Sequence, residues 1–115
     1  MTAQTLAPHT DSLLPIIELL VVDSLDVSTL IRFSEQLEDA ITLRPDRLVV
    51  DLAGCDYMDA QAIRVLMDTH RSLWLQGGRL TLRGVNPATM RLLTLAGVRD
   101  VFAIDNHAAQ SAMVG

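Results

Sequence analysis

Short apolar runs alternate with segments of helical periodicity along most of this 115-residue chain. The most constraining run is Leu-Val-Val-Asp-Leu at residues 48–52, because it is apolar with little alternation. That pattern is typical of a strand covered on both faces in a parallel sheet. Similar runs at residues 14–22, 79–85 and 101–104 predict three more strands. Strands separated by helices in this way predict an α/β fold.

The segments between these runs have the spacing of amphipathic helices. The apolar face of the first is formed by Leu30, Phe33, Leu37 and Ile41, and that of the second by Ile63, Leu66, Met67, His70, Leu73 and Trp74. Asn86 and Pro87 predict the start of a third helix, which runs to about Ala96. A final short helix is expected at residues 106–113. We therefore predict a single compact domain at residues 13–115, after a flexible N-terminal tail at residues 1–12. Its sheet is expected to be mostly parallel or mixed, with four to five strands and about four helices, the fifth strand coming from the N-terminal region.

Composition excludes several classes of function. The net charge is −5, lysine is absent, and the nine arginines are scattered, which argues against nucleic-acid binding and against lysine-dependent chemistry. Cys55 is the single cysteine, so neither an intramolecular disulfide nor a cysteine-rich zinc site is expected. The N-terminus lacks the pattern of a signal peptide, and no apolar run approaches about 20 residues. We expect a cytoplasmic protein that does not insert into membranes.

Three loops are expected at the carboxyl ends of the strands, where function gathers in an open α/β sheet. They comprise residues 23–26, 54–61 and 84–87. The loops offer carboxylates, amides and one thiol but no histidine or lysine, so we predict no enzymatic activity and no cofactor. Asp51 and Asp56 flank the middle loop, but no histidine or further carboxylate stands at ligand spacing, so no metal site is predicted.

The middle loop lies in the run LVVDLAGCDYMDAQAIRVLM, which resembles the central segment of STAS domains. In that family, a strand ending in "DL-x-G" leads to "D-S-x-G" and a helix. Ser24-Leu25-Asp26 resembles the family's "G-x-L-D" turn before the first helix. Further similarity is found in Gly77-Gly78-Arg79-Leu80, in Val85-Asn86-Pro87 and in the segment from Leu95 to Phe102. The resemblance covers roughly residues 13–112 and implies a STAS-like domain of the anti-sigma factor antagonist type.

The resemblance implies partner switching, in which an anti-sigma factor that is also a kinase phosphorylates the serine of "D-S-x-G" and binding is lost. Here Asp59 keeps the aspartate, Ala60 stands at the position of the serine, and Ala62 replaces the glycine. Phosphorylation at residue 60 is therefore excluded. Two interpretations stay open: the surface binds its partner without this switch, or the domain has acquired another partner or a structural role.

The expected partner is an anti-sigma factor or a serine-kinase-like regulatory protein, and a homodimer is possible. The alternatives are an accessory subunit of a transporter ATPase complex and a structural or scaffolding STAS protein. The candidate partner-binding residues lie in or beside the three loops: Ser24, Asp26, Asp56, Tyr57, Met58, Asp59, Ala60, Gln61, Arg64 and Asn86.

Several of these residues also have a purely structural interpretation. Asp26 and Asp59 could each be the N-cap of the helix that follows. Asp56 could bond to its own backbone. Tyr57 and Met58 could be binding anchors or could close the core. Outside the candidate set, Cys55 is expected in the core and His70 in a partly buried packing position.

Overall fold

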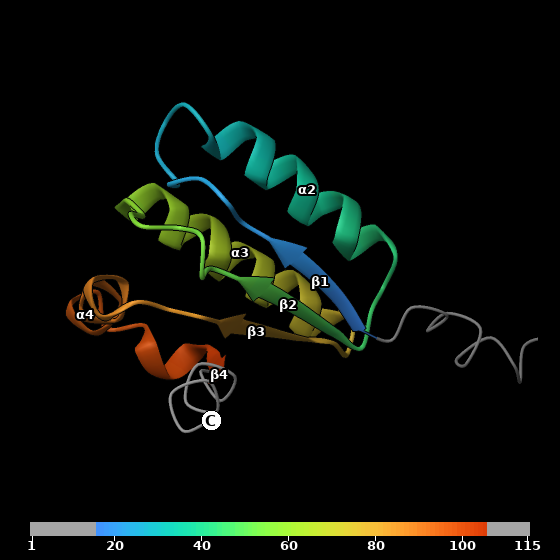
Figure 1. Ribbon diagram of the computed structural model, residues 1–115. Helices are drawn as coiled ribbons and strands as arrows, with labels where there is room; N and C mark the ends of the chain where they lie inside the picture. Colours follow the sequence, from blue (N-terminus) through green and yellow to red (C-terminus); the bar gives the residue numbers. More distant parts are fainter. Residues whose placement is uncertain (1–15, 106–115) are drawn as a thin grey trace, which may run out of the picture.

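The structure is a computed structural model, and it describes residues 16–105 (Figure 1). Strands and helices alternate along this part of the chain, as the apolar runs predict. In chain order the elements are β1 (Ile16–Leu20), α2 (Leu30–Thr42), β2 (Arg47–Asp51), α3 (Ala60–Leu75), β3 (Arg79–Arg83), α4 (Pro87–Leu95), the short 3-10 helix η1 (Arg99–Val101) and β4 (Ala103–Asp105).

The four strands form one parallel sheet in the order β1-β2-β3-β4. Their register aligns Leu19, Val50, Leu82 and Ile104 in one row across the sheet. The next row, which contains Leu20, Asp51, Arg83 and Asp105, points to the opposite face, because successive side chains of a strand alternate. The predicted α/β fold with a mostly parallel sheet is confirmed.

Helices α2 and α3 lie side by side over one face of this sheet (Figure 1). Phe33 and Leu37 of α2 and Leu66 and Leu73 of α3 are buried, so the predicted apolar faces pack against the strands. Beneath the helices, β2 is covered on both faces as predicted, with Leu48, Val49 and Val50 all buried. Each fully buried leucine contributes about 1.5–3 kcal/mol to folding.

The C-terminal part of the sheet differs from the prediction. The strand expected at residues 101–104 is present as β4, but it begins two residues later, at Ala103, and ends at Asp105, because Val101 is the last residue of η1. Val101 donates a backbone hydrogen bond to the carbonyl of Val98, which completes a tight turn, while the next residue, Phe102, is extended and buried. The strand expected at residues 79–85 ends at Arg83, because Gly84 adopts a positive φ of 71°.

Trp74 is a second departure, since its side chain is 59% exposed rather than packed in the core. Successive residues of a helix are rotated by about 100°. The buried residues of α3 are Ala62, Ile63, Leu66, Thr69 and Leu73, so the buried face is rotated from the predicted one and Trp74 lies at its edge.

Some expectations fall outside residues 16–105. These are the N-terminal tail, the fifth strand, residues 14 and 15 of the first strand and the helix at residues 106–113. Among the described helices, none has both the length and the apolar character needed to cross a membrane.

Candidate functional site

The first two strand-end loops are joined along their backbones. Leu25 and Met58 form an isolated parallel bridge. The N–H of Leu25 donates to the carbonyl of Tyr57 over 2.8 Å, and the N–H of Asp59 donates to the carbonyl of Leu25 over 3.0 Å. These bonds bring Ser24 and Asp26 beside Tyr57 and Asp59, as the topology predicts, although the residues are more than 30 positions apart in the sequence.

Asn86 connects the third loop to the second. Its Oδ1 accepts a hydrogen bond of 2.7 Å from the N–H of Thr89, so it is the predicted N-cap of α4. Its Nδ2 donates to the carbonyl oxygens of Cys55 and Asp56, each over 3.3 Å. One side chain thus caps a helix and holds the neighbouring loop.

Asp59 is the N-cap of α3, which confirms its structural interpretation. Its Oδ1 accepts a hydrogen bond of 2.9 Å from the N–H of Ala62. Ala60 is then the first residue of α3, and its side chain is exposed, as are those of Gln61 and Arg64. The alanine that stands at the serine position of the family therefore faces solvent at a helix N-terminus.

Asp26 does not cap α2, so that alternative is wrong. The helix begins at Leu30, and Thr29 occupies the N-cap position without a side-chain cap. Asp26 instead accepts hydrogen bonds from the Ser28 hydroxyl (2.6 Å) and the Ser28 N–H (2.9 Å). These bonds to Ser28 lower the pKa of Asp26 below its ordinary value, so the carboxylate stays charged in the turn.

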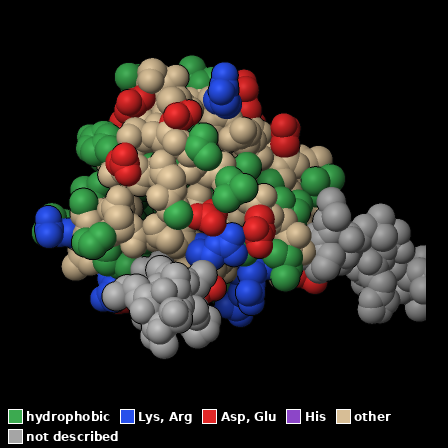
Figure 2. Space-filling model, in the orientation of Figure 1, with side chains coloured by type: hydrophobic (Ala, Val, Ile, Leu, Met, Phe, Trp, Pro, Cys, Tyr) green, Lys and Arg blue, Asp and Glu red, His purple; other side chains and the backbone are tan. Residues whose placement is uncertain are grey.

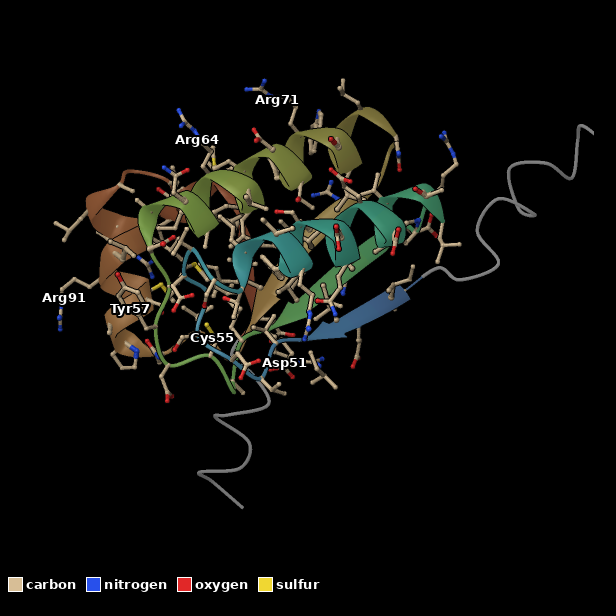
Figure 3. The ribbon with its side chains drawn as sticks, turned by 90° about the horizontal axis from the view of Figure 1, so that it is seen from above. Asp51, Cys55, Tyr57, Arg64, Arg71 and Arg91 are labelled. Atoms are coloured by element: carbon tan, nitrogen blue, oxygen red, sulfur yellow. The ribbon has the colours of Figure 1, made fainter. Side chains whose placement is uncertain are left out.

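The middle loop separates its apolar side chains between core and surface. Met58 and Cys55 are each 2% exposed, so Met58 closes the core and Cys55 takes the core position expected for it. Burial raises the pKa of the Cys55 thiol, which donates to the carbonyl of Tyr57. The side chain of Tyr57 is 56% exposed, and Figure 3 shows it on the side of the loop near α4. Of the two possible anchors, Tyr57 alone is exposed to solvent.

Asp51 belongs to an ion-pair network on the sheet face away from α2 and α3. Arg83 contacts Asp51 at 3.0 Å and Glu18 at 3.1 Å, which raises the pKa of the guanidinium, chiefly through its hydrogen bonds to Glu18 and Asp51. Asp51 also accepts from the N–H of Ala53. Its carboxylate is therefore committed to local structure.

Exposed apolar residues beside the loops were not predicted as site residues. Val27 is 84% exposed and Ile31 is 73% exposed, at the end of the molecule where the helices begin. Figure 2 shows hydrophobic side chains along this end. Neither residue belongs to the apolar face formed by Leu30, Phe33, Leu37 and Ile41. An apolar residue outside that face was the sequence signal that could have identified them as surface contacts. We define the strand-end surface as the side chains of Ser24, Asp26, Val27, Tyr57, Ala60 and Gln61; the exposed Asp56 and Arg64 and the half-buried Asn86 flank it.

A groove of about 250 Å³ lies beside this surface, between the end of β1 and the first turns of α2. It is lined by Val22, Asp23, Ser28, Arg32 and other residues of the same two segments. In residues 16–105, no group of three or more histidine, cysteine or carboxylate side chains is placed to hold a metal ion. The arrangement offers apolar and hydrogen-bonding contacts on well-anchored loops, which suits protein binding.

Comparison with known proteins identifies the family of this chain. The family model for the STAS domain matches residues 8–111. The chain is similar to an anti-sigma F factor antagonist from Paenibacillus polymyxa, with 28% identity over 74 residues, which are 63% of each chain. The alignment thus spans less than two thirds of that relative.

Two crystal structures share the fold. One is an anti-sigma factor antagonist from Mycobacterium paratuberculosis, with a TM-score of 0.74 and 19% identity over 87% of this chain and 85% of the other. The second is a putative anti-sigma factor antagonist from Thermotoga maritima, with a TM-score of 0.73 and 17% identity over 90% of each chain. At these identities the likeness concerns the fold. Because the STAS domain model matches nearly the whole chain, this protein belongs to the STAS domain family.

Proposed function

We propose that this protein is a regulatory binding module that docks on an anti-sigma factor, or on a serine-kinase-like regulatory protein, through the strand-end surface and without a serine-phosphorylation switch. The observation that carries the proposal is the exposed Ala60 at the first position of α3, beside the exposed ring of Tyr57. Similarity to an anti-sigma F factor antagonist supports the class of partner. The proposed setting is the cytoplasm.

The missing switch follows from chemistry. Residues 54–62 contain no serine or threonine, so a serine kinase has no acceptor hydroxyl in the loop that leads into α3. A phosphate at residue 60 would add a charge of about −1.5 to −2 in the middle of the proposed surface. Alanine at this position adds no charge to that surface, and docking is then controlled by the amounts of the two proteins.

Ala60→Glu tests the docking surface without removing the fold. A carboxylate in the first turn of a helix is compatible with the helix dipole, so α3 should form normally. An unpaired charge buried in an interface costs about 3–5 kcal/mol, which weakens binding by more than about a hundredfold. Ala60→Gln is the matched control, because it has nearly the same shape and no charge.

The experiment is an affinity pull-down from the native cell extract with the wild type and both variants, followed by titration calorimetry with the recovered partner. We expect the wild type and Ala60→Gln to retain an anti-sigma factor and Ala60→Glu to lose it. Equal binding by both variants would show that the strand-end surface is not used. Recovery of a transporter ATPase subunit in its place would favour the accessory-subunit alternative and overturn the proposal.

A further inference from the structure

A cleft lies on the far half of α3, away from the strand-end surface. Its volume is about 370 Å³, and it is lined by Met67, His70, Arg71, Trp74 and Val101, four residues of α3 and one of η1. The nearest of them along the helix, Met67, follows Ala60 by two turns, which is about 10 Å of helix. The cleft is therefore distinct from the proposed docking surface.

The wall of the cleft is an indole held in place by its neighbours. The ring centroid of Trp74 lies 6.1 Å from that of His70, which in turn packs edge-on against Phe102 at 6.1 Å. Phe102 is buried, so His70 connects the surface indole to the core. The guanidinium carbon of Arg79 lies 5.6 Å from the centroid of Trp74, a cation–π distance. Although it is more than half exposed, the indole has defined contacts that favour one orientation.

The charged side chain that lines this cleft is opposite in sign to the net charge of the chain. Arg71 lines it and Arg79 lies against its tryptophan, while no acidic side chain is among the described residues that form it. Asp68, the acidic residue of α3, lines a separate groove between α2 and α3. Figure 3 shows Arg71 and Arg64 projecting from α3 on the side away from α2. The net charge of the chain is −5, so the arginine-lined cleft is a local exception.

We propose that this cleft binds a planar aromatic anion, with its ring packed against Trp74 and Met67 and its anionic group directed to Arg71. The volume lies at the lower end of the range for small-molecule sites, which are mainly apolar with a few polar groups that fix orientation. A flat indole and a polarisable thioether suit an aromatic ring, and a guanidinium suits a carboxylate. The proposal does not depend on the strand-end surface or on its partner.

The test uses 2-naphthoate as the probe and its neutral analogue 2-naphthamide as the control. Trp74 is the single tryptophan, so its indole N–H gives one assignable NMR signal inside the cleft. We expect naphthoate to shift this signal and the Met67 methyl signal in a saturable way, and naphthamide to bind about two- to fivefold more weakly. Equal binding of the two compounds would overturn the charge argument. Shifts centred on Val27 and Tyr57, or no saturable shift, would overturn the site.

Two variants assign the contributions. Arg71→Gln should weaken naphthoate binding by about two- to fivefold, the range for an exposed ion pair, whereas Arg64→Gln, two turns away on the same helix, should leave it unchanged. Trp74→Leu should abolish saturation of the Met67 signal, and because the indole is exposed the fold should be retained. Unchanged binding by Arg71→Gln or by Trp74→Leu would contradict the proposal.

Discussion

Asn86 has two structural tasks, and the substitution Asn86→Asp separates them. The variant keeps an oxygen that can accept the hydrogen bond from the N–H of Thr89, now 2.7 Å from Oδ1. It replaces the Nδ2 donor, which lies 3.3 Å from the carbonyl oxygens of Cys55 and Asp56, with a carboxylate oxygen. Two carbonyl acceptors would then face a third acceptor, and the middle loop would lose its attachment to α4.

The size of the effect follows from these contacts. Asparagine and aspartate are nearly equal as N-caps, so the capping contribution is retained. Each lost hydrogen bond contributes about 0.5–1.5 kcal/mol, and repulsion between the facing oxygens adds to the loss. At low salt, the new negative charge interacts favourably with the N-terminus of α4 and offsets about 0.3–1 kcal/mol of this loss. In 1 M NaCl, where that interaction is screened, we expect Asn86→Asp to lower the free energy of unfolding by about 1–3 kcal/mol.

Urea unfolding followed by circular dichroism measures this difference, with Asp59→Asn as the matched control. That variant makes the reverse exchange at the other N-cap, where the side chain accepts from the N–H of Ala62 and an asparagine oxygen can do the same. In 1 M NaCl its effect should fall within about 0.5 kcal/mol. If Asn86→Asp costs no more than Asp59→Asn, the bonds to the middle loop contribute nothing and the reasoning is refuted.

Three further predictions concern backbone strain and protonation. Gly84→Ala and Gly97→Ala each place a side chain at positive φ, but an added Cβ at Gly84 would lie 2.9 Å from the backbone nitrogen of Ala53, whereas the space at Gly97 is open. Chemical denaturation should show that Gly97→Ala lowers the free energy of unfolding by about 1 kcal/mol and that Gly84→Ala lowers it by about 1–3 kcal/mol more. Because burial raises the pKa of Cys55, the wild type should lose stability as the pH rises above the ordinary value of about 9, and Cys55→Ala should not show this loss; parallel pH curves would contradict the buried thiol. The lowered pKa of Asp26 should be visible in an NMR titration and should return part of the way toward its ordinary value in Ser28→Ala, which removes the hydroxyl and keeps the backbone N–H; an unchanged titration would show that the Ser28 hydroxyl is not a cause.

Local sequence patterns predicted those features that depend on few neighbours. Asp59 and Asn86 are N-caps as expected, because a cap needs only its own side chain and the next three residues. Asp26 also stands just before a predicted helix, but it is not an N-cap. Ser28 and Thr29 form competing hydrogen bonds with its side chain, and α2 begins only at Leu30. Hydroxyl residues two and three positions after an aspartate therefore weaken a prediction of capping.

Features that depend on distant neighbours were not predicted. The last strand was predicted at residues 101–104, but its start was not, because the turn closed by Val98 and Val101 delays β4 to Ala103. Trp74 fits the apolar spacing of α3 as well as Leu73 does, and the packing of α3 on β3 decides which of them is buried. In both cases tertiary contacts choose between two assignments that the local pattern allows.

The strand-end surface illustrates the same limit. The topology predicted that the loops would meet, but Tyr57 and Met58 are adjacent and both apolar, so the sequence could not decide which of them faces solvent. The bridge between Leu25 and Met58 decides it, because it turns both of these side chains into the core. Neighbouring side chains in extended backbone point to opposite sides, so Tyr57 is left on the surface. If this is the cause, replacing Leu25 with a smaller residue should loosen the position of Tyr57, whereas replacing the exposed Val27 should not.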